Sequence, residues 1–153
     1  MKQRARDGLC IRGHVRLWAR GHIVAEADNL IVSTGKALVS DMLIDTSGYD
    51  TGLTYTAIGT GTTAPVAGNT TLGVETARKA ITLRERAANV LLLQTFFPAA
   101  DCSTFIKEIG VFGHSTASAT PDSGVLFART LLSYDNSGGS PSDLTLDWEI
   151  TIG

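Results

Sequence analysis

Residues 144–152 have the sequence LTLDWEITI, and this stretch decides the fold class. Apolar side chains occupy every second position from Leu144 to Ile152, and the positions between them hold Thr, Asp or Glu. Successive side chains of a β-strand point to opposite faces, so the pattern predicts a strand with one buried and one solvated face. An amphipathic helix would instead need apolar residues three or four positions apart.

Strand patterns recur along the rest of the chain. They cover residues 9–18, 22–26, 55–58, 77–86, 89–97, 104–112 and 124–133, with turn-rich segments between them. The nearly continuous apolar run at 89–97 predicts a strand buried on both faces. Gly13 interrupts the apolar face of 9–18, which predicts an edge strand or a bulge there. Short strands at this spacing predict an all-β fold, either an antiparallel β-sandwich or a jelly-roll-like barrel.

One short helix is expected among these strands. Ser33 and Thr34 offer a cap before residues 35–44. Ala37, Leu38, Asp41, Met42 and Leu43 follow at a spacing that places them on one face of a helix.

Composition limits the class of protein. The chain has 153 residues, of which 43% are hydrophobic and 18% are charged, and this excludes a disordered chain and fits one domain with an extension. No apolar run approaches the roughly 20 residues that span a bilayer, and residues 1–18 lack the pattern of a secretory signal, so no membrane partner is expected. Two cysteines cannot build a four-ligand zinc site, and no cofactor is expected.

Charge is unevenly distributed. Residues 1–20 carry six Lys or Arg against one Asp (net +5), and the remaining residues carry seven bases against fourteen acids (net −7). We therefore predict a basic N-terminal arm over residues 1–28 and a β-sandwich domain over residues 29–153. The residues expected to make contacts between subunits are Lys2, Arg4, Arg6, Arg12, Arg16, Trp18 and Arg20.

The arm has three possible uses: phosphate contacts with nucleic acid, docking on an acidic protein surface, or none if it is a solvated tail. Docking is favoured because Trp18 is the arm's one aromatic side chain for base stacking and the acidic body would repel phosphate. Deletion of residues 2–20 is then expected to leave a folded body that assembles weakly.

Each catalytic or cofactor-binding motif that we tested lacks the neighbouring residues that such a site requires. Residues 59–64 match G-x-G-x-x-A, but Pro65 and Gly68 follow where a dinucleotide site needs a helix. None of the three histidines has a His or Cys partner at metal-ligand spacing, and nothing around Cys102 indicates a lowered thiol pKa. An enzyme is not expected.

Four charged residues are expected to be structural. Glu75 and Arg78 lie three positions apart and can form a local salt bridge. Glu108 interrupts an apolar strand, so it is either exposed or buried with a partner. We favour burial with an arginine, such as Arg78 or Arg129, which would fix strand register or an interface.

Four segments in order resemble small structural domains of tailed-bacteriophage virions. They are residues 57–65 (AIGTGTTAP), residues 71–78 with Leu72, Glu75 and Arg78, residues 106–112 (IKEIGVF) and residues 126–129 (LFAR). The similarity covers about residues 29–131, so the basic arm lies outside it. It implies a β-sandwich of the kind used in trimeric capsid decoration proteins and in tail-fibre-like parts.

The resemblance implies a non-enzymatic protein of the virion, made in the cytoplasm of the bacterial host. The leading expectation is a trimeric decoration, or cement, protein that stabilises the capsid exterior by contacts with its own copies and with the major capsid protein. A tail-fibre, baseplate or tail-tip component is the alternative. A carbohydrate-binding module is a further alternative from another class, with Trp18, Tyr49, Tyr55 and Tyr134 as the aromatic side chains left to contact a sugar.

Overall fold

The computed structural model describes residues 8–44 and 52–153. Its elements are β1 (Ile11–Ala19), β2 (His22–Ile31), α1 (Ser33–Leu43), β3 (Leu53–Gly59), β4 (Glu75–Ala80), β5 (Leu83–Ala87), β6 (Val90–Phe97), the 3-10 turn η1 (Ala99–Asp101), β7 (Phe105–Gly113), β8 (Val125–Asp135) and β9 (Leu144–Ile152). The predicted all-β fold with one short helix is confirmed.

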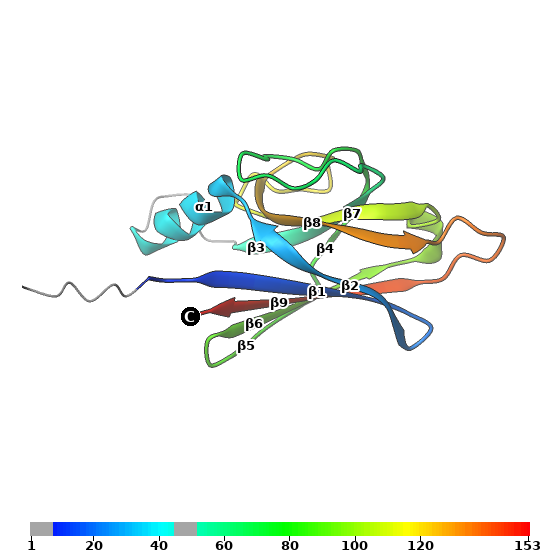
Figure 1. The fold of residues 1–153 in the computed structure, drawn as a ribbon, viewed down its shortest axis with the longest axis horizontal. Helices are drawn as coiled ribbons and strands as arrows, with labels where there is room; N and C mark the ends of the chain where they lie inside the picture. The colour runs from blue at the N-terminus through cyan, green and yellow to red at the C-terminus, as the bar shows by residue number, and fades with distance from the viewer. Residues whose placement is uncertain (1–7, 45–51) are drawn as a thin grey trace, which may run out of the picture.

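The nine strands of the described residues belong to one antiparallel sheet with the order β4-β3-β7-β8-β2-β1-β9-β6-β5. The sheet curls so that two halves face each other (Figure 1). We call β4, β3, β7 and β8 the upper half, and β1, β9, β6 and β5 the lower half. β2 belongs to both, because its residues up to Asn29 pair with β1 whereas Leu30 and Ile31 pair with β8.

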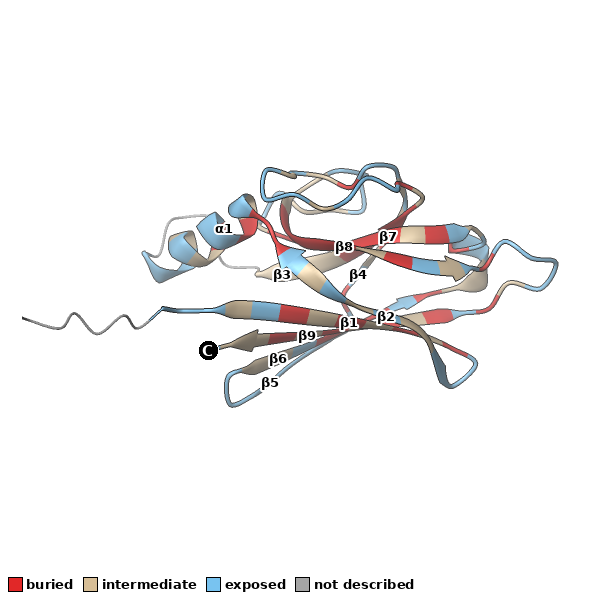
Figure 2. Cartoon of the chain, viewed as in Figure 1, coloured by how far each residue is buried: buried red, intermediate tan, exposed pale blue. Residues whose placement is uncertain are grey.

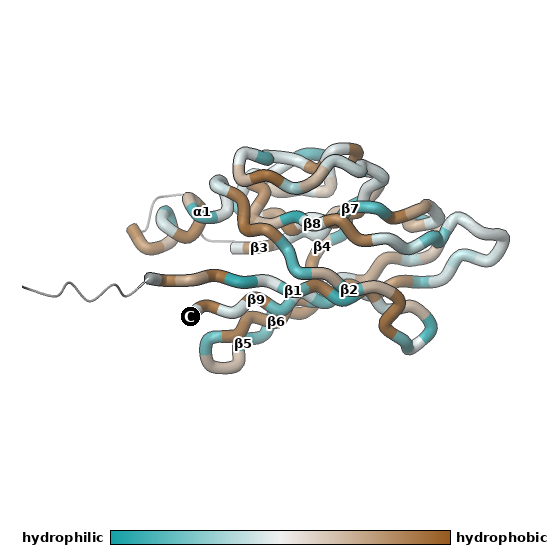
Figure 3. The backbone as a smooth tube through the Cα atoms, viewed as in Figure 1, coloured by the Kyte–Doolittle hydropathy of each residue, from teal (hydrophilic) through white to brown (hydrophobic). Residues whose placement is uncertain are grey.

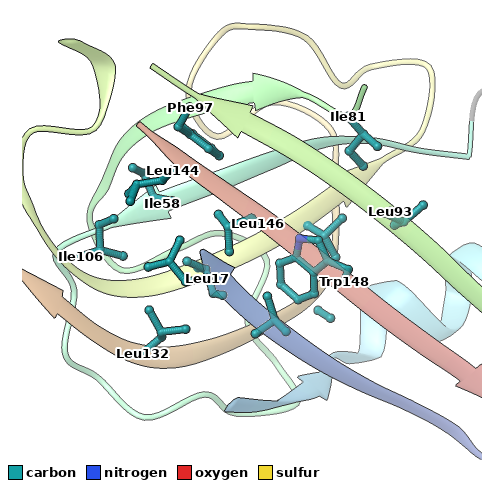
Figure 4. Packing of buried hydrophobic residues seen from close by; sticks show 14 of the residues in the cluster. Leu17, Ile58, Ile81, Leu93, Phe97, Ile106, Leu132, Leu144, Leu146 and Trp148 are labelled. Atoms are coloured by element: carbon teal, nitrogen blue, oxygen red, sulfur yellow. The ribbon is translucent and has the colours of Figure 1, made fainter. Parts of the chain in front are cut away.

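The main core lies between the two halves (Figure 4). Leu17 of β1 and Trp148 of β9 enter it from the lower half, and Ile58 of β3 enters it from the upper half; none has exposed surface. Polar groups also join the halves there. The Trp148 indole Nε1 donates to the Thr56 hydroxyl at 3.1 Å, and the Thr56 and Thr95 hydroxyls lie 2.8 Å apart.

A second, smaller core lies on the other face of the upper half. Leu72, from the loop of residues 60–74, packs there with Ala57, Phe112 and Leu126. The loops drawn above β7 and β8 cover this face, so both faces of these strands are largely buried (Figure 2). The upper half is thus covered by loops, and the outer face of the lower half is open.

The predicted arm over residues 1–28 is corrected by the structure. β1 lies inside the sheet, between β2 and β9, and Val15 and Leu17 have no exposed surface. Residues 11–28 are therefore part of the β domain, and the expected boundary near residue 28 is not a structural break. The expectation of an edge strand at 9–18 is wrong for the same reason. Gly13 pairs in regular register with Asn29 and Ile150, and the register shift of β1 lies between Leu17 and Trp18.

One other expectation about burial is wrong. β6 is buried on one face only, since Leu92 and Phe96 are exposed on the open side of the lower half. Helix α1 forms where predicted, but only Gly35 and Leu38 of it are buried. In the part of the chain that the structure describes, no helix is long and apolar enough to cross a membrane.

Candidate functional site

The four segments that carry the resemblance meet at the carboxylate of Glu108, on the loop-covered face of the upper half. Glu108 lies in β7 and has no exposed surface. Its Oε1 accepts backbone hydrogen bonds from Gly61 at 3.0 Å and Val74 at 2.7 Å. Its Oε2 accepts from the Gly73 backbone at 2.9 Å and from Arg129 Nη2 at 2.7 Å. One buried carboxylate therefore fixes both ends of the loop over residues 60–74.

Arg129 of β8 completes this arrangement. Its Nη2 also donates to the Thr63 carbonyl and its Nη1 donates to Asn69 Oδ1, each at 3.0 Å. The predicted burial of Glu108 and its pairing with an arginine are confirmed, and the partner is Arg129. A buried ion pair of this kind lowers the free energy of the fold only when further hydrogen bonds compensate for its desolvation. Here three backbone N–H groups donate to the carboxylate and two loop oxygens accept from the guanidinium, whereas Arg129 Nε has no hydrogen-bond partner among the described residues.

The glycines of the 59–64 motif allow the backbone to pack closely around the Glu108 carboxylate. A side chain at Gly61 would overlap Glu108 Oε1, and a side chain at Gly59 would overlap the Val74 carbonyl. The backbone can approach Glu108 only because these positions lack a Cβ. The G-x-G pattern that resembles a phosphate-binding loop is therefore explained by close packing around a carboxylate.

Glu75 and Arg78 form a separate ion pair, so the four predicted residues are two pairs. The carboxylate of Glu75 binds Arg78 Nε at 2.6 Å and Nη2 at 2.7 Å, and both side chains are buried. Arg78 Nη1 donates to the Ser123 carbonyl at 2.8 Å, and the guanidinium lies 4.5 Å from the centre of the Phe112 ring. This pair holds the loop between β7 and β8 against β4 in the way that Glu108 holds the 60–74 loop.

Cys102 is a buried thiol beside η1. Burial raises its pKa from 9.0 to about 11, and its Sγ lies 3.2 Å from the Pro98 carbonyl oxygen and 3.6 Å from that of Phe97. At neutral pH the group is therefore a protonated thiol and not a thiolate nucleophile. Among residues 8–44 and 52–153, no three His, Cys, Asp or Glu side chains are placed to hold a metal ion together.

The seven residues predicted to make contacts between subunits fall into three groups. Lys2, Arg4 and Arg6 lie outside the described residues. Arg12, Arg16 and Trp18 lie on the open face of the lower half, where Arg16 is 3.3 Å from Glu149 and 3.8 Å from Glu26. Arg20 donates to Ser142 Oγ at 2.8 Å. Arg16 and Arg20 thus have partners within their own chain.

His14 lies beside Arg16 on the same face and was not among the predicted site residues. Its Nδ1 is 2.8 Å from Asp28, and its Nε2 is 3.3 Å from Glu26. The hydrogen bond to Asp28 is the largest influence on this ring and raises the pKa of His14 above 6.5, although burial and the nearby Arg16 oppose the effect. Basic β1 residues and acidic β2 and β9 residues therefore alternate across this face.

The aromatic residues named for sugar binding do not form one surface. Tyr55 packs against the smaller core and Tyr134 against the main core. Trp18 lies on the open face of the lower half, in a cross-strand row with Ile23 and Thr145. Tyr49 lies outside the described residues.

One apolar surface was not predicted. It lies at the end of the molecule that holds the C-terminus and the free end of α1 (Figure 1). A groove of about 550 Å³ opens there between α1 and the ends of the lower-half strands, lined by residues that include Ile11, Met42, Leu43 and Leu91. The available sequence signal was the run Met42-Leu43-Ile44, because three consecutive residues cannot all share the buried face of a helix.

Comparisons of the chain with protein-family models, with curated proteins and with solved structures found no match.

Proposed function

We propose that this chain is a non-enzymatic structural protein of a tailed-bacteriophage virion, and that it acts as a trimeric decoration protein on the capsid exterior. The observation that carries the proposal is the convergence at Glu108. The four segments on which the resemblance rests, far apart in sequence, supply the carboxylate, its arginine and the backbone donors of one arrangement. The sequence pattern on which the resemblance rests therefore specifies a hydrogen-bonded arrangement that holds the 60–74 loop rigidly on the sheet.

The use of the charged groups also supports a structural role. Both oxygens of Glu108 are occupied, and the Glu75 carboxylate is held by Arg78 in a two-point ion pair. In general a catalytic acid or base must be within reach of a substrate, whereas these carboxylates face backbone groups and arginines of their own chain. Their effect is to fix two surface loops on the sheet.

A decoration protein works by burying area against its neighbours, and the fold offers surfaces of different kinds for this. The upper half presents two pinned loops, and the lower half presents an open face with ion pairs and the exposed side chains of Leu92 and Phe96. Rigid surfaces lose little conformational entropy on binding, which favours assembly at many equivalent positions. The partners in this proposal are other copies of the chain and the major capsid protein.

The same features would suit a tail-fibre, baseplate or tail-tip component, which is the alternative. Copy number distinguishes the two locations. Quantitative mass spectrometry of virions purified from the phage that encodes this chain should give a ratio to the major capsid protein close to one copy per subunit. A total of only a few dozen copies per particle would indicate that the protein belongs to the tail. Its absence from virions would overturn both forms of the proposal.

A further inference from the structure

An open hollow of about 370 Å³ lies on the outer face of the lower half, beside the turn between β1 and β2. Hydrophobic and hydrophilic positions alternate along β1 and β9, and the side chains that line the hollow are on the face opposite to the core (Figure 3). We call it the turn hollow. Its lining side chains are Trp18, Arg20, Gln94, Asp143, Thr145 and Asp147.

The undescribed residues are too far away to cover the turn hollow. Residues 1–7 precede Gly8, and roughly 33 Å of extended chain separates Gly8 from Trp18, whereas seven residues span at most about 25 Å. Residues 45–51 are flanked by the free end of α1 and the start of β3, which lie at the end of the molecule away from the β1–β2 turn (Figure 1). The described residues alone therefore determine how far the hollow is exposed.

Trp18 supplies the one apolar side chain of this lining. Its cross-strand neighbour on β9 is Thr145, and Phe96 of β6 lies on the other side of Thr145. A small hydroxyl side chain is thus placed between two aromatic ones. A ligand in the hollow meets the Trp18 ring on one side and polar groups around it.

The carboxylates of the turn hollow are held by their own chain and keep capacity for a ligand. Asp147 Oδ1 accepts from Gln94 Nε2 at 2.9 Å, and Asp143 Oδ1 accepts from the Ala99 backbone at 2.8 Å. Among the described residues, neither Asp147 Oδ2 nor Asp143 Oδ2 has a hydrogen-bond partner. Side chains that are already fixed lose little conformational entropy when they bind a further group.

This lining favours an uncharged ligand with many hydroxyl groups. The two carboxylates repel an anion such as phosphate, and the guanidinium of Arg20, which Ser142 holds at 2.8 Å, repels a cation. One aromatic side chain among five polar ones offers little room for the apolar anchors on which protein interfaces depend. A saccharide ring fits both parts of the lining, because its C–H face packs on an aromatic ring and its hydroxyls donate to carboxylate and amide oxygens.

We propose that the turn hollow binds a neutral saccharide. Trp18 packs against the C–H face of a sugar ring, and Asp143 and Asp147 accept hydrogen bonds from its hydroxyls. This binding is a property of the purified chain and does not rest on the proposed virion role, so its test is independent of the copy number in virions.

The test is a titration of the isotope-labelled full chain, followed by NMR through the indole N–H signals of its two tryptophans. The probes are the methyl glycosides of glucose, galactose, mannose and N-acetylglucosamine, with spermidine as the cationic probe. Trp18 reports on the hollow. Trp148 is the internal control, because its indole donates to Thr56 in the core.

Two variants are compared with the native chain. Asp147→Ala removes one proposed acceptor, and Glu149→Ala is the matched control, since it removes a carboxylate from the next outward position of β9, outside the lining. Circular dichroism verifies that each variant is folded, and Asp143→Ala replaces Asp147→Ala if the latter is not.

We expect at least one glycoside to shift the Trp18 signal in a saturable manner and to leave the Trp148 signal in place. Asp147→Ala should raise the dissociation constant of that glycoside at least about tenfold, as loss of a hydrogen bond to a charged group does, and Glu149→Ala should not change it. A Trp18 signal that no glycoside shifts overturns the proposal, and so does one that only spermidine shifts. An Asp147→Ala variant that binds as tightly as the native chain also overturns it.

Discussion

The carboxylate of Glu108, which has no exposed surface, accepts hydrogen bonds from three backbone N–H groups and from Arg129. Glu108→Ala would leave those donors unsatisfied and the guanidinium buried without its counter-charge. We expect a loss of about 3–5 kcal/mol in the free energy of unfolding, the range found when one member of a buried ion pair is removed. Urea denaturation followed by circular dichroism measures this value.

The matched control for Glu108→Ala is Glu85→Ala, which removes the same side chain from an exposed position of β5. It should change the free energy of unfolding by less than about 0.5 kcal/mol. Equal effects of the two substitutions would contradict the role given to the buried carboxylate.

His14 makes stability depend on pH in a defined direction. The pKa of His14 is raised in the folded chain, mainly by the hydrogen bond to Asp28. A raised pKa means that the folded state binds the proton more tightly than the unfolded state, so the added stability is present below pH 6.5 and is lost as the pH rises through the folded pKa. The acidic partners are exposed, so the contribution should stay below about 1 kcal/mol.

The measurement compares the free energy of unfolding of the native chain and of His14→Gln between pH 6 and pH 8. The native chain should lose more stability than the variant over this interval. His22 and His114 are present in both proteins, so their contributions cancel. A steeper decrease in the variant would reverse the sign argued for His14.

At the scale of elements, the position of β1 in the sheet limits how many N-terminal residues can be deleted without unfolding the domain. The sequence led us to expect a folded body without residues 2–20, but that deletion removes the strand between β2 and β9 together with Val15 and Leu17 of the core. The variant lacking residues 2–20 should therefore show no cooperative thermal transition by circular dichroism. Deletion of residues 2–7 leaves every described strand intact and should preserve the transition. Cooperative melting of the longer deletion would show that β1 is dispensable.

Helix α1 forms where the sequence predicts a helix, but only part of its apolar side is buried. Spacing predicted a helix, and the chain forms one at Ser33–Leu43. Its buried residues are Gly35 and Leu38, and Gly35 lies so close to the Phe127 backbone of β8 that a side chain would not fit. The second half extends past the sheet, so Met42 and Leu43 are exposed although their spacing suits a buried face.

At the scale of the whole molecule, Thr56 links the two halves of the sheet. Its hydroxyl accepts from the Trp148 indole and bonds to Thr95, both from the lower half. Thr56→Val keeps the shape of the side chain but leaves a buried indole N–H without its acceptor. We expect a loss of about 1–3 kcal/mol in the free energy of unfolding, measured by urea denaturation.

Thr54 of the same strand provides a control with the same chemical change. Its hydroxyl oxygen is buried and has no hydrogen-bond partner among the described residues. Thr54→Val removes an unsatisfied polar group, so it should be neutral or stabilising. A larger loss for Thr54→Val than for Thr56→Val would contradict the link proposed between the halves.

The sequence by itself determined the all-β class, most of the strand positions and the helix, and it favoured the burial of Glu108 with an arginine. These features depend on local spacing, since alternation over LTLDWEITI requires no knowledge of its neighbours and a charge between Ile106 and Ile109 must be exposed or paired. Local spacing could not decide whether Arg129 or Arg78 is the ion-pair partner of Glu108. The choice required the pairing of β7 with β8, which places residues 21 positions apart within 2.7 Å.

Only the tertiary structure decided which surfaces are covered. The apolar run of β6 predicted two buried faces, but Leu92 and Phe96 are exposed. The basic pattern of β1 suggested an arm, whereas the curl of the sheet buries Val15 and Leu17 and leaves Arg12 and Arg16 on the open side. Burial results from contacts between residues far apart in sequence, so neither composition nor periodicity of one segment can specify it.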